Sequence, residues 1–515
     1  MTVRRIMGIE TEYGLIEPGN AWANPIEMST QIVQGYAAGV PHADWDYAGE
    51  DPLSDARGYR ITRAAADPSQ LTGDPDLTAH GGGFHLSELR RGSIRGGPAN
   101  AVLTNGARLY VDHAHPEYSS PEVTNPRDAV VWDRAGDEVM LEAMAAVLDT
   151  GREVVIYKNN VDGKGASYGT HENYLVERSV PFHELAHHLT PFFVTRPVVC
   201  GAGRVGLGQR SQEPGFQVSQ RADYVENDIG LETTFNRPII NTRDEPHADP
   251  DRWRRLHVIG GDANRFDVPA YLKFATTSLV LWLAEHDHLP LELEALSLSA
   301  PVVDSWGVSH EPFGHELSTQ GRSVRALDVQ RTYLDVVARF VDRAGADAET
   351  TFALDLWDAV LDGLATDPES VAHQVEWVAK KQLLDGLRRR GNLSWDNPRL
   401  AALDLQWADL RPEHSVVARL DAAGRVRRLV SQAEVHAARF APPADTRAYF
   451  RGTMVARFPG AVAAAGWSSV VVDAPGRRAL VRIPLSDPHR GTRARTTRLF
   501  EFEEIDELLS TLGGE

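Results

Sequence analysis

The chain has 515 residues, of which 42% are apolar and 24% are charged, a composition typical of a folded globular protein. Its formal net charge of -19 disfavours nucleic acid as a partner, because the sequence contains no strongly basic run to overcome that charge. The most apolar stretch, residues 274–284, is about half as long as a membrane-spanning helix. The one cysteine, Cys200, excludes an internal disulfide. We therefore expect a soluble, cytoplasmic protein without a nucleic-acid or membrane partner.

The N-terminal part begins with a predicted strand. Apolar and polar residues alternate over residues 6–14, which is typical of a half-buried strand and places Glu10 and Glu12 on one face. Residues 41–100 are rich in Gly, Pro, Asp and Ser and show no periodicity. This composition predicts a long mobile loop inserted near the functional site.

A second alternating segment, residues 107–113, predicts another strand, and a helix is predicted over about residues 125–149. Apolar residues recur at helical spacing over 333–341 and 354–364. A turn signal at residues 441–443 precedes two predicted strands, 468–473 and 479–483, and a closing helix from about residue 501. We therefore predict a large domain over residues 1–435 and a small C-terminal domain over residues 436–515.

Polar side chains share one face of the predicted strands. Because alternate residues of a strand point to the same side, Arg108, Tyr110 and Asp112 project together, while Leu109 and Val111 face the core. The same spacing recurs in the pairs Glu10/Glu12, His171/Asn173 and Arg221/Asp223. Carboxylates with a histidine favour a magnesium site that is shared with nucleotide phosphates. Solvated charges on ordinary surface strands are the alternative interpretation.

Other catalytic motifs find little support. The sequence has no GxxxxGK[ST] phosphate loop and no GxSxG serine elbow, and its GxGxxG match at residues 201–206 lacks the strand-to-helix context of a dinucleotide site. The arginines are the better candidates for binding phosphates or carboxylates.

Five segments carry a resemblance to a known family. Residues 7–14 (MGIETEYG), 105–112 (NGARLYVD), 115–118 (HPEY), 169–174 (GTHENY) and 240–249 (INTRDEPHAD) together resemble the family of Pup ligases and Pup deamidase/depupylases. The resemblance implies an α+β, glutamine synthetase-like large domain with a curved antiparallel sheet backed by helices, followed by a small C-terminal α/β domain. It also implies ATP, or ADP with phosphate, and Mg²⁺ as cofactors.

The resemblance assigns roles to individual residues. The implied magnesium site contains Glu10, Glu12, Tyr110, Glu117 and His171. The implied nucleotide contacts are Arg108, Ser120, Asn173, Arg221, Arg243, His257 and Trp467. Asp112 is the implied catalytic residue, as a covalent nucleophile or as a general base for water.

The long insertion before residue 105 and the run Val-Asp-His-Ala-His at residues 111–115 resemble the deamidase branch. That branch converts the C-terminal glutamine of Pup to glutamate and removes Pup from lysines, and it needs nucleotide without consuming it at each turnover. Pup and pupylated proteins are the expected partners, and no stable protein partner is evident. The alternatives are an ATP-consuming Pup ligase or other glutamate-amine ligase, and a non-catalytic binder of Pup or nucleotide.

Overall fold

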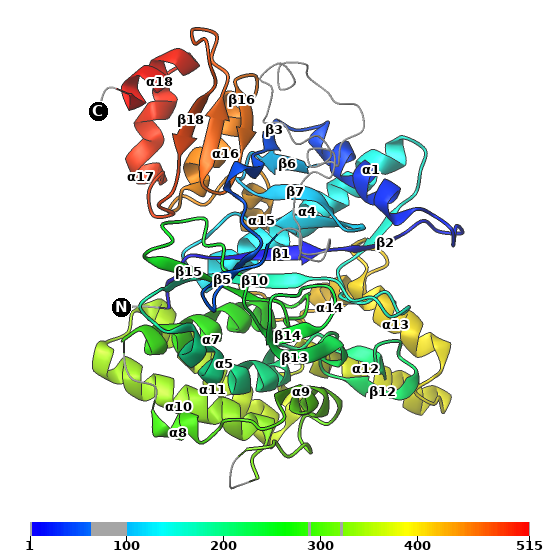
Figure 1. Ribbon diagram of the computed structural model, residues 1–515. Coiled ribbons are helices and arrows are strands. Elements are labelled where there is room, and N and C mark those ends of the chain that lie inside the picture. Colours follow the sequence, from blue (N-terminus) through cyan, green and yellow to red (C-terminus); the bar gives the residue numbers. More distant parts are fainter. Residues whose placement is uncertain (1–2, 63–99, 287–289, 320–322, 514–515) are drawn as a thin grey trace.

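A computed structural model describes residues 3–62, 100–286, 290–319 and 323–513 (Figure 1). Its centre is a ten-stranded sheet in the order β15-β10-β1-β8-β7-β6-β3-β16-β17-β18. All neighbouring strands are antiparallel except β3 and β16, which are parallel. In chain order these strands are β1 (Met7–Glu12), β3 (His42–Trp45), β6 (Asn100–Leu103), β7 (Arg108–Asp112), β8 (His115–Ser119), β10 (Thr170–Glu177), β15 (Trp253–Val258), β16 (Val462–Ala465), β17 (Ser469–Val472) and β18 (Val481–Pro484).

Helices cover one face of this sheet (Figure 1). Helix α4 (Pro126–Asp149) lies against the middle strands, and α1 (Pro25–Ala37) packs beside it on β7 and β8. The Asn125 side chain caps α4 by accepting a hydrogen bond from the Asp128 backbone N–H at 2.9 Å, and Pro126 occupies the first turn, where no N–H is needed. Leu109 is fully buried under α1 and α4, so the opposite face of β7 carries Arg108, Tyr110 and Asp112, as predicted.

A second layer of helices surrounds α7 (Asp267–His286), whose residues are almost all buried. The remaining α-helices are α5 (Phe182–Thr195), α6 (Pro197–Cys200), α8 (Leu291–Glu294), α9 (Pro301–His310), α10 (Ala326–Ala344), α11 (Ala348–Thr366), α12 (Glu376–Gly391), α13 (Pro398–Ala408), α14 (Val416–Ala422), α15 (Gln432–Ala438), α16 (Ala448–Arg457), α17 (Arg493–Thr496) and α18 (Ile505–Leu512). Short elements complete the fold: β2 (Gly14–Ile16), β4 (Ser54–Asp55), β5 (Tyr59–Arg60), β9 (Val155–Tyr157), β11 (Arg204–Leu207), β12 (Glu213–Gln217), β13 (Val225–Gly230) and β14 (Arg237–Asn241), with 3₁₀ turns η1 (Tyr47–Gly49), η4 (Ala222–Tyr224), η5 (Pro368–Val371) and η6 (Thr497–Glu501). None of the helices in the described part of the chain has the length and apolar character needed to cross a membrane.

The C-terminal strands extend the main sheet. Ala464 and Ala465 of β16 pair with Asp44 and Trp45 of β3, so β16, β17 and β18 continue the sheet beyond its N-terminal strands. A separate apolar cluster beneath them draws mainly on residues after 450. The C-terminal part thus has most of a core of its own while sharing the sheet, and the domain boundary at residue 436 stays a prediction.

The predicted loop over residues 41–100 is wrong for its first part. Residues 41–62 contain β3, η1, β4 and β5, and β3 lies inside the sheet between β6 and β16. Its alternation of exposed His42 and Asp44 with buried Ala43 and Trp45 spans only four residues, which is too short to stand out in a segment rich in Gly and Pro. The rest of the predicted loop, residues 63–99, lies outside the described residues.

Candidate active site

The register of the central strands places most of the predicted site residues in rows across the open face of the sheet. Glu10 on β1 stands opposite His171 on β10. Glu12 stands opposite Glu117 on β8, and Glu117 stands opposite Tyr110 on β7. Directly opposite residues of antiparallel strands project from the same face, with Cβ atoms about 5 Å apart. The face therefore carries two groups of polar side chains. One surrounds Glu10 and is called the Glu10 corner; the other surrounds Glu12 and Glu117, two residues further along β1, and is called the acid corner.

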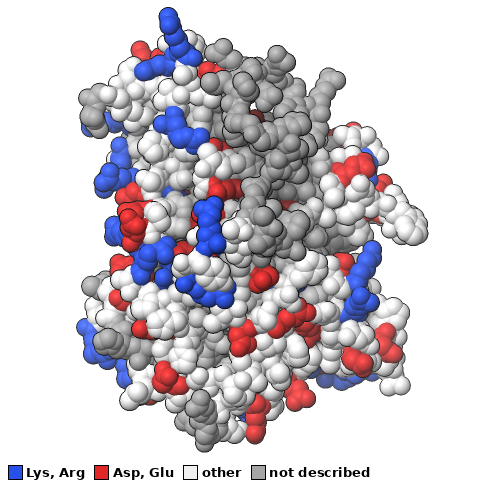
Figure 2. All heavy atoms as spheres, viewed as in Figure 1, with Lys and Arg blue, Asp and Glu red and all other residues white. Residues whose placement is uncertain are grey.

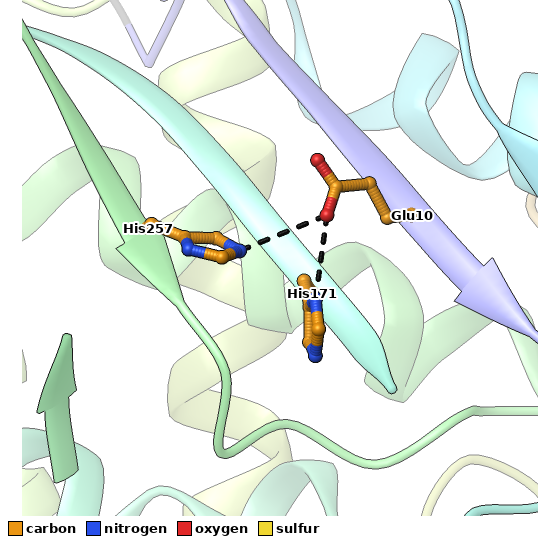
Figure 3. Close-up of side chains that lie close together, drawn as sticks. All are labelled: Glu10, His171 and His257. Atoms are coloured by element: carbon orange, nitrogen blue, oxygen red, sulfur yellow. Dashed lines mark hydrogen bonds and ion pairs between the residues drawn. The ribbon is translucent and has the colours of Figure 1, made fainter. Parts of the chain in front are cut away.

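At the Glu10 corner, one carboxylate is surrounded by nitrogen atoms (Figure 3). Its Oε2 lies 3.3 Å from His171 Nδ1 and 3.7 Å from His257 Nε2. The Asn173 side-chain amide donates a hydrogen bond to Oε1 at 3.0 Å, and the Arg255 guanidinium lies 3.7 Å from the same oxygen. Burial raises the pKa of Glu10, but the neighbouring His171 and His257 rings and the charge of Arg255 outweigh it and hold that pKa well below its usual value.

His257 is held neutral at this corner. Burial and the neighbouring Arg255 lower its pKa to about 3, so its ring carries a free lone pair at neutral pH. Neither ring nitrogen has a hydrogen-bond partner among the described residues. One ligand atom each from Glu10, His171 and His257 lies within 4.8 Å of the others, a spacing that a single cation can bridge.

The acid corner combines Glu12, Asp112 and Glu117, whose ligand atoms also lie within 4.8 Å of one another. Glu117 accepts hydrogen bonds from the Tyr110 hydroxyl at 2.5 Å and from Ser119 Oγ at 3.0 Å. Burial and the negative charges of Asp112, Glu10 and Glu12 nevertheless raise the pKa of Glu117 well above its usual value. Among the described residues Glu117 has no basic partner, and three carboxylates this close together fit a hard cation such as Mg²⁺.

Glu12 differs from Glu117 because it has a basic partner. Its Oε2 lies 3.3 Å from His115 Nδ1, and its Oε1 accepts a hydrogen bond from the Gly169 backbone N–H at 2.7 Å. Burial raises the pKa of Glu12, but His115 outweighs it and brings that pKa down to about 2.

Asp112 is the last residue of β7 and the most accessible acid of this corner, with its side chain 29% exposed. Its Oδ2 lies 2.8 Å from Nδ1 of His113, which the turn after β7 holds in the left-handed region at φ 52°. The hydrogen bond to Asp112 raises the pKa of His113 to about 9, so the imidazolium orients the carboxylate at neutral pH. His113 carries no predicted role, and only its position next to Asp112 at a strand end could have indicated one.

Arg108 is held between two aromatic rings. Its guanidinium carbon lies 4.0 Å from the centre of the Trp45 ring and 3.8 Å from that of Tyr110. Its Nε donates to Asn100 Oδ1 at 3.0 Å. Trp45 comes from β3, so this arrangement depends on the strand that the sequence analysis assigned to a loop.

A cavity opens beside Glu10. Ser120 and Asn173 line it from the sheet, and Arg447 and Trp467 line it from the C-terminal part. Trp467 also meets Trp45 edge to face, with ring centres 5.2 Å apart. The cavity thus unites three of the predicted nucleotide contacts with Arg447, which the sequence analysis missed.

Four of the seven predicted nucleotide contacts, Arg108, Arg221, Arg243 and His257, are not among the residues that line this cavity. Arg221 is buried and donates a hydrogen bond to the Tyr168 carbonyl, and burial together with Arg237 lowers its pKa to about 9. The prediction that Arg221 and Asp223 share a strand is wrong, because η4 occupies this segment. Arg243 forms an isolated backbone bridge with Asp55. Neither arginine is among the residues that line the cavity beside Glu10.

The model of one protein family, the Pup-ligase proteins, matches residues 5–471. The chain belongs to the Pup-ligase family. It is 49% identical to the depupylase of Acidothermus cellulolyticus, over 99% of this chain and 100% of that protein. It is 48% identical to the Pup deamidase/depupylase of Mycobacterium tuberculosis, over 97% of each chain.

Two solved structures of the Pup ligase PafA share the fold. The complex of PafA with Pup superposes with a TM-score of 0.76 at 30% identity, covering 99% of this chain and 94% of that chain. The complex of PafA with ADP superposes with a TM-score of 0.71 at 32% identity, covering 86% of this chain and 95% of that chain. The predicted α+β, glutamine synthetase-like fold with a curved sheet backed by helices is confirmed.

Proposed function

We propose that this protein is an ATP- and magnesium-dependent hydrolase that deamidates the C-terminal glutamine of Pup and cleaves the isopeptide bond between Pup and lysine. The observation that carries the proposal is Asp112, an accessible carboxylate oriented by His113 at the edge of the acid corner. Similarity to named depupylases over nearly the whole chain supports the same reaction. Pup and pupylated proteins are the proposed partners.

The cofactor part of the proposal rests on the two corners and the cavity between the sheet and the C-terminal part. The residues proposed to hold Mg²⁺ are Glu10, Glu12, Tyr110, Glu117 and His171. The residues proposed to contact the nucleotide are Arg108, Ser120, Asn173, Arg221, Arg243, His257 and Trp467. A bound magnesium ion would supply positive charge that stabilises the oxyanion of the attacked amide.

Asp112 is the proposed catalytic residue. As a nucleophile, its carboxylate would attack the amide carbon, and the leaving nitrogen would take up a proton and depart as ammonia or the lysine amine. Water would then hydrolyse the anhydride that this step leaves. As a general base, it would instead take a proton from the water that attacks the same carbon. In both routes the His113 imidazolium, 2.8 Å from Oδ2, would orient the carboxylate.

A cytoplasmic location belongs to the proposal as well. The one cysteine, Cys200, is free and buried, and burial raises the pKa of its thiol to about 12, so it is suited to a structural role in a reducing compartment. On the face shown in Figure 2, basic and acidic side chains are interspersed, and the chain as a whole carries a net charge of -19. Such a surface offers nucleic acid little attraction.

The test is to incubate the protein with Pup ending in glutamine, with and without ATP and Mg²⁺, and to read the product by intact mass. We expect the mass change that replacement of the amide NH₂ by OH produces, only when nucleotide is present. Cleavage of a pupylated protein into free Pup and unmodified target should show the same requirement.

The second candidate is an ATP-consuming Pup ligase, which the likeness to PafA favours. A ligase would release one ADP for each bond formed and would couple Pup ending in glutamate to a lysine-bearing protein. Equilibrium binding of Pup without any product would instead favour the third candidate, a non-catalytic binder.

A further inference from the structure

A cluster of possible metal ligands lies outside the sheet, on the helices α5 and α8. His187 Nε2 lies 3.2 Å from Glu294 Oε1, and His188 Nε2 lies 3.8 Å from Glu294 Oε2. One ligand atom of each residue lies within 4.8 Å of the other two. The two imidazole rings are nearly perpendicular, at 80°, with centres 4.9 Å apart, and each has a nitrogen within 3.8 Å of the Glu294 carboxylate.

A proline follows the two histidines within the same helix. Pro191 lies inside α5 and has no N–H to bond the carbonyl of His187, four residues earlier, and its ring crowds that carbonyl. The helical hydrogen-bond ladder is therefore interrupted at the turn that carries the two histidines. The Tyr333 hydroxyl, donating to the His188 carbonyl at 2.5 Å, fixes this turn against α10.

The cluster is both anchored and accessible. The His188 side chain is 12% exposed, whereas those of His187 and Glu294 are 40% and 56% exposed. Glu294 ends α8, a single turn that contacts α10 and is tied to it by the ion pair between Glu292 and Arg339 at 2.5 Å. A dissolved ion can therefore reach the ligands, and only exposed side chains need to adjust their rotamers.

We propose that His187, His188 and Glu294 bind a transition-metal dication of the Zn²⁺ class. Two imidazoles and one carboxylate are a donor set that zinc, cobalt, nickel and copper accept, while Mg²⁺ prefers oxygen ligands alone. Three protein ligands leave one position for water, as in open zinc sites. The bound ion would join α8 to α5, so it should stabilise the folded state.

The alternative is a plain ion pair in which a protonated His187 faces Glu294. Such a pair needs the imidazolium, whereas a metal ligand needs the neutral ring. Metal titration distinguishes the metal site from the ion pair. A metal site binds zinc stoichiometrically, whereas a stable ion pair competes with the metal and gives no stoichiometric binding.

The experiment titrates Zn²⁺ into full-length protein that has been stripped with EDTA, in excess Mg²⁺ and without nucleotide, by calorimetry. The matched control is His414→Ala, because His414 is an exposed histidine whose neighbour Glu413 lies 4.0 Å away, with no second histidine in that pair. Because Glu10, His171 and His257 offer zinc the same donor set, every protein in this titration also carries Glu10→Ala. In this background we expect one binding event, which is unchanged in His414→Ala and weakens by about 10-fold or more in His187→Ala and in Glu294→Gln.

Thermal unfolding gives a second readout that also checks folding of each variant. In the same background, Zn²⁺ should raise the midpoint of Glu10→Ala alone and of its combination with His414→Ala, and should leave that of its combination with His187→Ala unchanged. Glu294→Gln changes an exposed side chain to one of the same size, so this variant should fold normally. It therefore provides the test if His187→Ala folds poorly. Identical zinc affinities in Glu10→Ala alone and with His187→Ala or Glu294→Gln added would overturn the proposal, whatever the protein does to Pup.

Discussion

Glu10 and Glu117 lie on adjacent strands of the same sheet face, and their surroundings push their pKa values in opposite directions. Glu10 is surrounded by His171, His257 and Arg255, which keep it ionised. Glu117 stands among acids, and its only close hydrogen-bond donors in the described structure are the hydroxyls of Tyr110 and Ser119. A glutamate on the same sheet face thus has basic neighbours at the Glu10 corner and acidic neighbours, with excess negative charge, at the acid corner. The acid corner, which contains Asp112, therefore needs a cation or a proton to offset its negative charge.

The largest effect is expected from removing a charge at the acid corner. Asp112→Asn keeps the size of the side chain and removes the carboxylate, so deamidation and depupylation should fall by about 10²–10⁴-fold. Rates are measured by intact mass of Pup over time. The matched control is Asp342→Asn, at an exposed position of α10, which should turn over like the wild type. Near wild-type turnover by a folded Asp112→Asn variant would sink the catalytic assignment.

A third acid near the sheet, Glu122, is paired with two arginines, and its pKa shows the effect of that pairing. Glu122 contacts the guanidinium groups of Arg447 and Arg451, which tie α16 to the sheet. Burial raises the pKa of Glu122, but the two arginines outweigh it and lower it from 4.5 to about 2. Glu122→Gln leaves two buried cations with weaker partners, so we expect a loss of about 3 kcal/mol in the free energy of unfolding.

The same pKa shift gives a signed pH dependence. Because the folded-state pKa lies below the unfolded-state value, this stabilisation is complete above pH 4.5 and is lost as the pH falls toward about 2. Urea unfolding at neutral and acid pH measures it. The difference between wild type and Glu122→Gln should shrink on acidification, and a difference that stays constant would contradict the account.

At the Glu10 corner, Glu10→Ala should weaken binding of magnesium nucleotide by about 10- to 100-fold. The substitution removes a carboxylate that is both a proposed metal ligand and the partner of two histidines. Calorimetric titration with ATP at limiting Mg²⁺ measures this. Excess Mg²⁺ should restore part of the affinity. Normal binding and turnover of Glu10→Ala at limiting Mg²⁺ would remove Glu10 from the metal site.

The smallest effect is expected at the cavity wall. Trp467→Ala removes an indole that lines the cavity and packs against Trp45 and the Arg451 guanidinium. We expect nucleotide affinity to fall by about 3- to 10-fold, the usual size of one aromatic contact. Trp467→Phe should recover most of the loss. An unchanged affinity in Trp467→Ala would place the nucleotide elsewhere.

Local periodicity was sufficient to predict which side chains share a face. The alternation over β7 separated Arg108, Tyr110 and Asp112 from buried Leu109, and α4 begins one residue from its predicted start. These features depend only on residues close in the sequence.

The pairing of distant strands could not be predicted this way. Glu10 stands opposite His171 because β1 pairs with β10, and nothing near either residue specifies that register. The contact of Trp45 with Trp467 depends on the parallel pairing of β3 with β16, across more than four hundred residues. The resemblance to the Pup-ligase family named Trp467 where periodicity alone would not have done so.

The central claim is that Glu10 helps to hold the magnesium nucleotide, whereas Asp112 carries out the chemistry and is not needed for nucleotide binding. The most direct measurement is a nucleotide titration of Asp112→Asn and Glu10→Ala side by side, with deamidation of Pup followed in the same preparations. The account predicts that Asp112→Asn binds magnesium nucleotide like the wild type and forms almost no product, while Glu10→Ala loses nucleotide affinity. If Asp112→Asn loses nucleotide binding as strongly as Glu10→Ala, Asp112 belongs to the cofactor site and the account is contradicted.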